Sequence, residues 1–381
     1  KRVMKRVLMI AGETSGDIYG AELARHLYQL APLSIAGIGG KRMREAGVDI
    51  LYDSSEISVV GISEILPHLR AIIRAYRIVT GLIKSRGADS LILIDYPGFN
   101  IRVAGVAKRF GIPVIYYISP QIWAWKKGRL RLLAQRIKKM IVILPFEEAI
   151  YKEAGVDCSF IGHPLVDEVL NTRPLEETIH RYGIDKDRPV IGLFPGSRIG
   201  EVSALLPDIL KAARILKDDN PQIQFVIAVA DSLDFQQIHE TLSRSSPEVK
   251  MDIKIIKGEA NDVLSICDII IAASGTITLQ AALLEKPMVI LYKLSPITHA
   301  IARLLVQVRH IGLVNILAGK RIVPELLQRE VTPEQIAVEA KKMLYDKDYY
   351  ARIKRDLHDV RIMMGPPGAS ERAARVIAGM L

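Results

Sequence analysis

The chain has 381 residues, enough for two or three domains, and its 49% hydrophobic and 25% charged residues exclude a disordered or fibrous protein. Lysine and arginine outnumber aspartate and glutamate by 52 to 42, and this net charge of +10 favours anionic partners such as nucleic acid, phosphorylated metabolites or an acidic membrane surface. The two cysteines form no Cys-x-x-Cys pair and the eight histidines no His-Glu-x-x-His motif, which argues against a disulfide framework and a cysteine or histidine metal site.

No segment has the length of a transmembrane helix or the layout of a signal peptide. There is no run of 18 uncharged apolar residues. The apolar stretch within residues 1–10 runs straight into Ala11 and Gly12 without a cleavage-like region, so we interpret it as a first strand. We therefore expect a soluble, cytoplasmic protein.

Short apolar runs alternate with helix-length amphipathic segments along the whole chain, which is the pattern of parallel β-α-β units. The predicted strands are residues 7–11, 34–38, 90–94, 114–118 and 139–144 in the first half, and 190–194, 224–229, 253–256, 269–273 and 288–292 in the second. The polar segment 167–188, with prolines near its ends, is the best linker. We expect the division to be an N-terminal domain over residues 1–168, a linker over 169–189, a C-terminal domain over 190–345, and C-terminal helices over 346–381 that return to the N-terminal domain.

Acidic residues follow two predicted strands of the first half, and ligands of open α/β sheets gather at the carboxyl ends of strands. Asp95 is the favoured general base, because Pro97 and Gly98 force a special backbone beside it and a carboxylate there can take a proton from a hydroxyl nucleophile. Glu13 and Asp17 are rival bases or orienting partners. A helix cap or loop acceptor explains each of these two equally well.

The segment 66–83 is predicted to form an amphipathic helix. Its apolar face holds Leu69, Ile72, Ile73, Tyr76, Val79 and Ile83, and a basic stripe of Arg70, Arg74 and Arg77 runs beside it. Such a helix can lie in a membrane interface with its arginines at the headgroups. A core helix with a polar back accounts for the pattern about equally well.

Both tryptophans, Trp123 and Trp125, stand directly before seven lysines and arginines in residues 126–139, where no acidic residue occurs. Tryptophans beside a basic run suit an anionic membrane interface. A groove for single-stranded nucleic acid, with stacking aromatic rings, is an alternative. A solvated helix is the third interpretation.

Two loops of the second half suit phosphate groups. Gly196, Ser197 and Arg198 follow one strand, and Ser274, Gly275 and Thr276 follow another and open a helix, where backbone N–H groups bind anions. A plain turn and an ordinary N-cap are the alternatives. Together the loops favour a nucleotide, although neither matches a dinucleotide fingerprint or a P-loop. The Asp-x-Asp triplets at 185–187 and 346–348 are interpreted as surface, so no metal is required.

The motifs, taken in order, resemble the lipid-A-disaccharide synthases from residue 11 to about residue 328. They are AGETSGD at 11–17, DYPGFN at 95–100, SPQIWAW at 119–125, LPFE at 144–147, GHPLVD at 162–167, PGSR at 195–198, ASGT at 273–276 and NILA at 315–318. Each motif is short, but the ordered set is highly specific.

The resemblance implies a GT-B glycosyltransferase of two Rossmann-like domains that face a central cleft, with no metal or other cofactor. It implies inverting transfer of 2,3-diacylglucosamine from UDP-2,3-diacylglucosamine to the 6-hydroxyl of 2,3-diacylglucosamine 1-phosphate (lipid X), which gives a β-1,6-linked disaccharide 1-phosphate and UDP. Peripheral attachment to the cytoplasmic face of the inner membrane is also implied, without a nucleic-acid partner. The family includes homodimers with exchanged C-terminal parts.

The resemblance also carries roles to individual residues. Asp95 becomes the base, with Glu13 beside it. Donor binding falls to Gly196, Ser197, Arg198, Ser274, Gly275, Thr276, Gln280 and Asn315, and acceptor or membrane contact to Leu69, Arg70, Ile72, Ile73, Arg74, Tyr76, Trp123 and Trp125. Gln280 departs from the pattern, because many relatives have a glutamate that accepts from the ribose hydroxyls. An amide loses the charge-assisted part of that bond, so nucleotide affinity is the property in question.

Three other functions compete with this one. A UDP-sugar 2-epimerase shares the two-domain fold but needs no lipid surface. A nucleic-acid-binding protein would explain the pI of about 9.4, and its binding would fall steeply with salt. The third is a non-catalytic, membrane-binding relative, against which the presence of both Asp95 and Arg198 argues.

Overall fold

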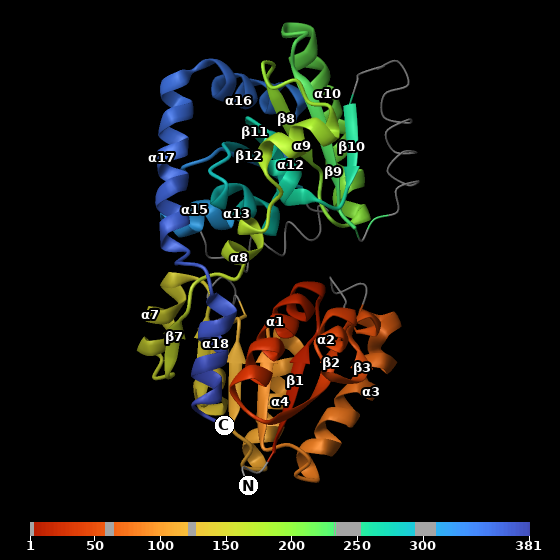
Figure 1. Cartoon of the computed structure of the whole chain (residues 1–381), viewed down its shortest axis with the longest axis vertical. Coiled ribbons are helices and arrows are strands. Elements are labelled where there is room, and N and C mark those ends of the chain that lie inside the picture. Colours follow the sequence, from red (N-terminus) through yellow and green to blue (C-terminus); the bar gives the residue numbers. More distant parts are fainter. Residues whose placement is uncertain (1–3, 58–64, 121–126, 232, 234–252, 294–309) are drawn as a thin grey trace. The chain divides into compact units, whose positions relative to one another are not determined.

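The computed structural model describes residues 4–57, 65–120, 127–231, 233, 253–293 and 310–381. It divides into two compact units (Figure 1). Unit 1 comprises Lys1–Pro164 together with Met364–Leu381, and unit 2 comprises Leu165–Met363. Each has its own parallel β-sheet, so the predicted α/β class is confirmed.

Unit 1 is built on a seven-stranded parallel sheet in the order β3-β2-β1-β4-β5-β6-β7. The strands are β1 (Lys5–Ala11), β2 (Leu33–Gly39), β3 (Asp49–Asp53), β4 (Ser90–Ile94), β5 (Val114–Tyr117), β6 (Lys139–Val142) and β7 (Cys158–Phe160). The helices are α1 (Thr14–Leu30), α2 (Lys41–Glu45), α3 (Ile65–Lys84), α4 (Pro97–Arg109), α6 (Lys127–Arg136), α7 (Pro145–Glu153) and α18 (Ala369–Ala378). Helices cover both faces of the sheet, which is why its central strands are continuous apolar runs (Figure 1).

Unit 2 has a six-stranded parallel sheet in the order β10-β9-β8-β11-β12-β13. Its strands are β8 (Val190–Phe194), β9 (Gln224–Val229), β10 (Ile253–Lys257), β11 (Ile269–Ala273), β12 (Met288–Tyr292) and β13 (Glu325–Leu327). Its helices are α8 (Leu165–Leu170), α9 (Leu175–Tyr182), α10 (Ile199–Asp219), α12 (Ala260–Ile266), α13 (Thr276–Leu283), α15 (Leu313–Ala318), α16 (Pro333–Tyr345) and α17 (Lys347–Met363).

The strand order reverses at one point in each sheet, and the motif loops lie there. In unit 1 the reversal falls between β1 and β4, where Ala11 pairs with Ile94, so the loops with Glu13 and Asp95 leave adjacent strand ends. In unit 2 it falls between β8 and β11, whose ends lead into the loops 195–198 and 274–276. Such switch points form the binding crevices of doubly wound sheets.

The unit boundaries differ from the expected ones. Residues 169–189 do not form a separate linker, because α8 and α9 pack within unit 2 against α13 and α12. The C-terminal helices belong to different units. Helix α18 packs on α1 in unit 1, whereas α17 packs on α13, α15 and α16 in unit 2. The reason is that α17 buries Ile353, Leu357 and Val360, an apolar stripe sparse enough to be overlooked in a polar helix.

Candidate active site

Asp95 stands at the carboxyl end of β4 on a strained turn. Asp95 and Tyr96 both have left-handed backbones, with φ of 45° and 46°, and Ile118 after the neighbouring strand has φ of 63°. The backbone oxygen of Asp95 accepts a hydrogen bond from Asn100 Nδ2 at 2.7 Å and another from the Tyr116 hydroxyl. Left-handed non-glycine residues cost roughly 1–3 kcal/mol each and cluster at functional sites. The special backbone expected beside Asp95 is therefore present.

The Asp95 carboxyl group has the electrostatics of a base that works near neutral pH. Burial raises its pKa to about 7, and the negative charge of Glu13 acts in the same direction. The same two causes raise the pKa of Tyr96. The Tyr96 ring lies so close to Gly12 that an added Cβ there would meet it at 2.2 Å. Glu13 is thus close enough to act electrostatically on both Asp95 and Tyr96, and any side chain at position 12 would collide with the Tyr96 ring.

The raised pKa predicts that Asp95 destabilises the fold at neutral pH. Between pH 4 and 7 the unfolded chain releases this proton while the folded chain keeps it, so the free energy of unfolding falls as pH rises. The rise from 3.8 to about 7 corresponds to at most about 4 kcal/mol. We expect Asp95→Asn to melt at a higher temperature than the wild type at pH 8, with the difference vanishing at pH 4. Equal melting temperatures at pH 8 in calorimetry would contradict this.

Asp17 is a structural cap, not a rival base. Its buried carboxylate accepts backbone N–H groups of Gly40, Arg42 and Met43 at 2.6, 3.0 and 3.1 Å, which are the first donors of α2. A carboxylate is favoured at a helix N-terminus because it satisfies these donors and complements the helix dipole. Glu13 precedes α1 but makes no side-chain cap bond there, so the cap alternative does not apply to it.

Most of the apolar face of α3 belongs to the core. Val79 and Ile83 are fully buried, while Ile72 and Tyr76 are partly buried against the core. The Tyr76 ring meets Phe99 edge-on, with centroids 5.9 Å apart. Leu69 and Ile73 are 44% and 42% exposed, beside the exposed Arg70, Arg74 and Arg77. The core interpretation thus explains four of the six apolar residues predicted on this face. Leu69 and Ile73, with the three arginines, form a small patch outside the core.

The basic run after the tryptophans is only partly a solvated surface. Arg136 donates to the Ile101 backbone oxygen at 2.8 Å and packs on Gly105, where an added Cβ would lie 3.1 Å from the guanidinium carbon. Arg131 and Lys138 are exposed. Trp123 and Trp125 lie outside the described residues.

Unit 2 contains a cavity of about 530 Å³ at the carboxyl ends of its strands. It is lined by both predicted phosphate loops, through Gly196, Ser197, Ser274, Gly275 and Thr276, and by Gln280. Asp231 and Gly258, which follow β9 and β10, line it as well. This volume lies within the range of pockets that bind small molecules and cofactors. The structure therefore brings six predicted donor residues to one pocket.

Arg198 and Asn315, the other two predicted donor residues, are placed differently. Arg198 Nη1 forms an ion pair with Glu201 at 3.0 Å, and the same carboxylate accepts the Ser197 N–H at 3.3 Å. Glu201 lines the cavity, so Arg198 stands at its edge. Asn315 is fully buried. Its side-chain amide forms hydrogen bonds with Glu325 and with the backbone of Ile322 and Val323. These bonds fix the segment that leads into β13.

Gln280 meets a carboxylate that the sequence analysis did not single out. Its Nε2 donates to Glu168 Oε1 at 3.0 Å, and both residues line the cavity. By its surface area Glu168 is exposed to solvent. The surrounding protein nevertheless desolvates it enough to raise its pKa, against hydrogen bonds from Gln280 and Asn261 that lower it. No sequence signal marks Glu168, because it is 112 residues from its partner.

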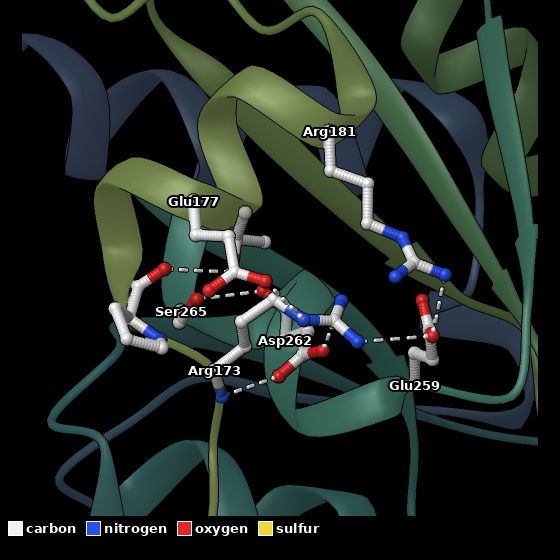
Figure 2. Close-up of polar contacts among 8 residues, drawn as sticks. Arg173, Glu177, Arg181, Glu259, Asp262 and Ser265 are labelled. Atoms are coloured by element: carbon white, nitrogen blue, oxygen red, sulfur yellow. Dashed lines mark hydrogen bonds and ion pairs between the residues drawn. The ribbon is translucent and has the colours of Figure 1, made fainter.

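An ion-pair network joins the segment after α8 to the cavity wall. Arg173 pairs with Asp262 at 2.9 Å and with Glu259 at 3.4 Å, and its own N–H donates to Asp262 at 2.8 Å (Figure 2). Arg181 reaches Glu259 at 3.1 Å. Glu259 and Asp262 line the cavity, so this network fixes residues 171–173 to it. Among the described residues, no group of three His, Cys, Asp or Glu side chains is arranged to hold a metal ion.

Comparison with known proteins identifies relatives over nearly the whole chain. The family model described as lipid-A-disaccharide synthetase matches residues 7–378. The lipid-A-disaccharide synthase of Geobacter sulfurreducens is 46% identical over 377 residues, covering 99% of this chain and 97% of the relative. That of Myxococcus xanthus is 39% identical over 377 residues, with 99% and 97% covered.

Solved structures show the same fold at much lower identity. The UDP-GlcNAc 2-epimerase of Neisseria meningitidis, bound to UDP-GlcNAc, superimposes with a TM-score of 0.68 at 14% identity and covers 98% of this chain and 100% of that one. The calicheamicin glycosyltransferase CalG4 gives 0.63 at 15% identity, with 99% and 98% covered. These likenesses reflect a shared GT-B fold. The family match spans the ordered motifs and the full length of both units, so the chain belongs to the lipid-A-disaccharide synthase family of glycosyltransferases.

Proposed function

We propose that this protein transfers 2,3-diacylglucosamine from UDP-2,3-diacylglucosamine to the 6-hydroxyl of 2,3-diacylglucosamine 1-phosphate. The products are the β-1,6-linked disaccharide 1-phosphate and UDP. The observation that carries the proposal is Asp95 at the switch point of the unit 1 sheet, because its pKa of about 7 suits a base that removes a hydroxyl proton at neutral pH. Family membership supplies the reaction class.

The chemistry proposed is one direct displacement. Asp95 takes the proton of the acceptor 6-hydroxyl while that oxygen bonds to the anomeric carbon, and the bond from this carbon to UDP breaks. An α-linked donor thereby becomes a β-linked product. UDP leaves as an anion, so stabilisation of charge matters more than a general acid. Glu13, next to Asp95, helps to hold its pKa high and to orient the acceptor.

The cavity of unit 2 is proposed to hold the UDP moiety. Backbone N–H groups at the start of α13, with Ser274 and Thr276, would bind the diphosphate, and Arg198 would add a positive charge. The neighbour of the same fold from N. meningitidis is bound to UDP-GlcNAc, which supports a UDP-sugar here. These cationic and N–H groups can stabilise the leaving diphosphate without a metal ion, so we propose that no metal is needed.

Incubating the protein with UDP-2,3-diacylglucosamine, with and without acceptor, tests the proposal. A transferase releases UDP only when the acceptor is present, in a one-to-one ratio with consumed acceptor. An epimerase instead changes the configuration at C2 of the donor sugar without any acceptor. Epimerisation without transfer, followed by NMR of the donor, would overturn the proposed function.

We also propose peripheral attachment to the cytoplasmic face of the inner membrane through the exposed patch of α3. Among the described residues, the structure contains no helix able to cross a membrane. Leu69 and Ile73 can enter the lipid interface while Arg70, Arg74 and Arg77 meet anionic headgroups. A homodimer with exchanged C-terminal parts stays a prediction; within this chain, α18 packs on α1.

The double variant Leu69→Ser, Ile73→Ser is expected to bind anionic vesicles at least tenfold more weakly than the wild type. Each exposed apolar side chain that enters the interface contributes on the order of 1 kcal/mol or more. Both side chains are solvent-exposed, so the fold should survive. The matched control is Leu175→Ser, which removes an equally exposed leucine from α9. Vesicle co-sedimentation that is unchanged in the double variant would refute the role of this patch.

A further inference from the structure

We propose that Glu168 is the residue that recognises the ribose of the nucleotide, by accepting hydrogen bonds from its vicinal 2′- and 3′-hydroxyls. This inference rests on the proposed binding of UDP in the unit 2 cavity. It assigns the ligand-binding carboxylate to α8, a helix within the segment that joins the two sheets, and gives Gln280 the task of positioning it.

The first support is the way Glu168 is held. Gln280 is buried and donates from Nε2 to Glu168 Oε1 at 3.0 Å. Asn261 also lines the cavity, and its Nδ2 donates to the Glu168 backbone oxygen at 3.5 Å. The Arg173–Asp262 pair ties down the chain five residues further on (Figure 2). Side chain and backbone of Glu168 are thus both anchored to elements that line the cavity.

The second support is position along α13. Gln280 lies four residues after Thr276, so it follows the helix start by about one turn, a rise of about 6 Å on the same face. A diphosphate bound at the helix start therefore presents its next chemical unit near Gln280 and Glu168. In a nucleoside diphosphate that unit is the ribose, whose hydroxyls require acceptors.

The third support is hydrogen-bonding capacity. An ionised carboxylate has two oxygens with about four acceptor sites, so Glu168 can accept from Gln280 and from two hydroxyls together. The Gln280 amide offers one acceptor oxygen, and its N–H group already donates a hydrogen bond to Glu168. Hydrogen bonds to an ionised acceptor are about twice as strong as neutral ones. The charge that glutamine at position 280 lacks is therefore present on the neighbouring helix.

The alternative is that the Glu168–Gln280 bond merely fastens α8 to α13. The two roles are separated by measuring how tightly each protein variant binds two nucleotides, one of which lacks the ribose hydroxyls. We would measure dissociation constants by calorimetry at pH 8 for UDP and 2′,3′-dideoxy-UDP, using the wild type, Glu168→Ala, and the control Glu176→Gln, which removes one exposed charge from α9. Melting curves check that each variant is folded.

The wild type and Glu176→Gln should bind UDP at least tenfold more tightly than the dideoxy nucleotide. Glu168→Ala should bind both with similar, weaker affinity. If Glu168→Ala keeps the wild-type ratio, the residue is only structural and the inference fails while UDP binding stands. If the wild type binds neither nucleotide, the proposed donor site fails as well. The swap Glu168→Gln, Gln280→Glu keeps one carboxylate in the pair, and it should restore at least part of the preference for UDP.

Discussion

Replacing Asp95 with asparagine is expected to lower turnover by about 10²–10⁴-fold, the range that general bases contribute, while the dissociation constant for UDP stays unchanged. Asparagine keeps the size and the acceptor oxygen of the side chain but cannot take a proton. UDP is proposed to bind in unit 2, whereas Asp95 belongs to unit 1, so binding and turnover should separate. Single-turnover kinetics with saturating donor measure this loss directly.

The pH dependence of turnover offers a check on the same residue. Only the ionised form of Asp95 can act as a base, so kcat/KM should increase tenfold per pH unit below about 7 and level off above it. The matched control is Asp89→Asn, which removes an exposed carboxylate just before β4 and should change neither rate nor profile. Near-normal turnover in Asp95→Asn would remove Asp95 as the base.

The variant Arg198→Ala is expected to lower kcat by about 10²–10³-fold, because it removes a charge-stabilising donor from the leaving diphosphate. Affinity for UDP should fall as well, since UDP carries the same diphosphate. The Arg198 guanidinium pairs with Glu201, which lines the cavity, and the Arg198 side chain is 55% exposed.

Arg198→Lys should recover only part of the activity, because lysine keeps the charge but loses the bidentate geometry of the guanidinium. The control is Arg188→Lys, which alters a half-buried arginine that donates to the Gln222 backbone oxygen and does not line the cavity. Steady-state kinetics and UDP calorimetry give both quantities. If Arg198→Ala kept wild-type kcat and UDP affinity, the diphosphate would have to be stabilised elsewhere.

Both sheets are largely predictable from the sequence, because their central strands are buried on both faces and read as apolar runs. For apolar runs such as 190–194 and 269–273, the predicted bounds and the observed bounds coincide. The missed strands β3, β7 and β13 are edge strands of three to five residues, and each includes polar or charged side chains. Edge strands bury less surface and therefore carry a weaker hydrophobic pattern.

The site was predictable where it depends on strand ends and less so where it depends on tertiary contacts. Asp95 and Ser274 follow buried strands directly, and the topology alone brings such positions to the switch points. Glu168 and Glu201 have no motif of their own, and their relevance comes from partners that only the fold places beside them. On α3, periodicity could not distinguish Val79, which is buried in the core, from Leu69, which is exposed.

The most direct test of the account is product analysis after incubation with UDP-2,3-diacylglucosamine and radiolabelled 2,3-diacylglucosamine 1-phosphate in mixed micelles containing EDTA. We expect a disaccharide 1-phosphate with a β-1,6 linkage by NMR, formed in equal amount with UDP and unaffected by the chelator. No disaccharide despite measurable UDP binding, or a product with retained α configuration, would contradict it.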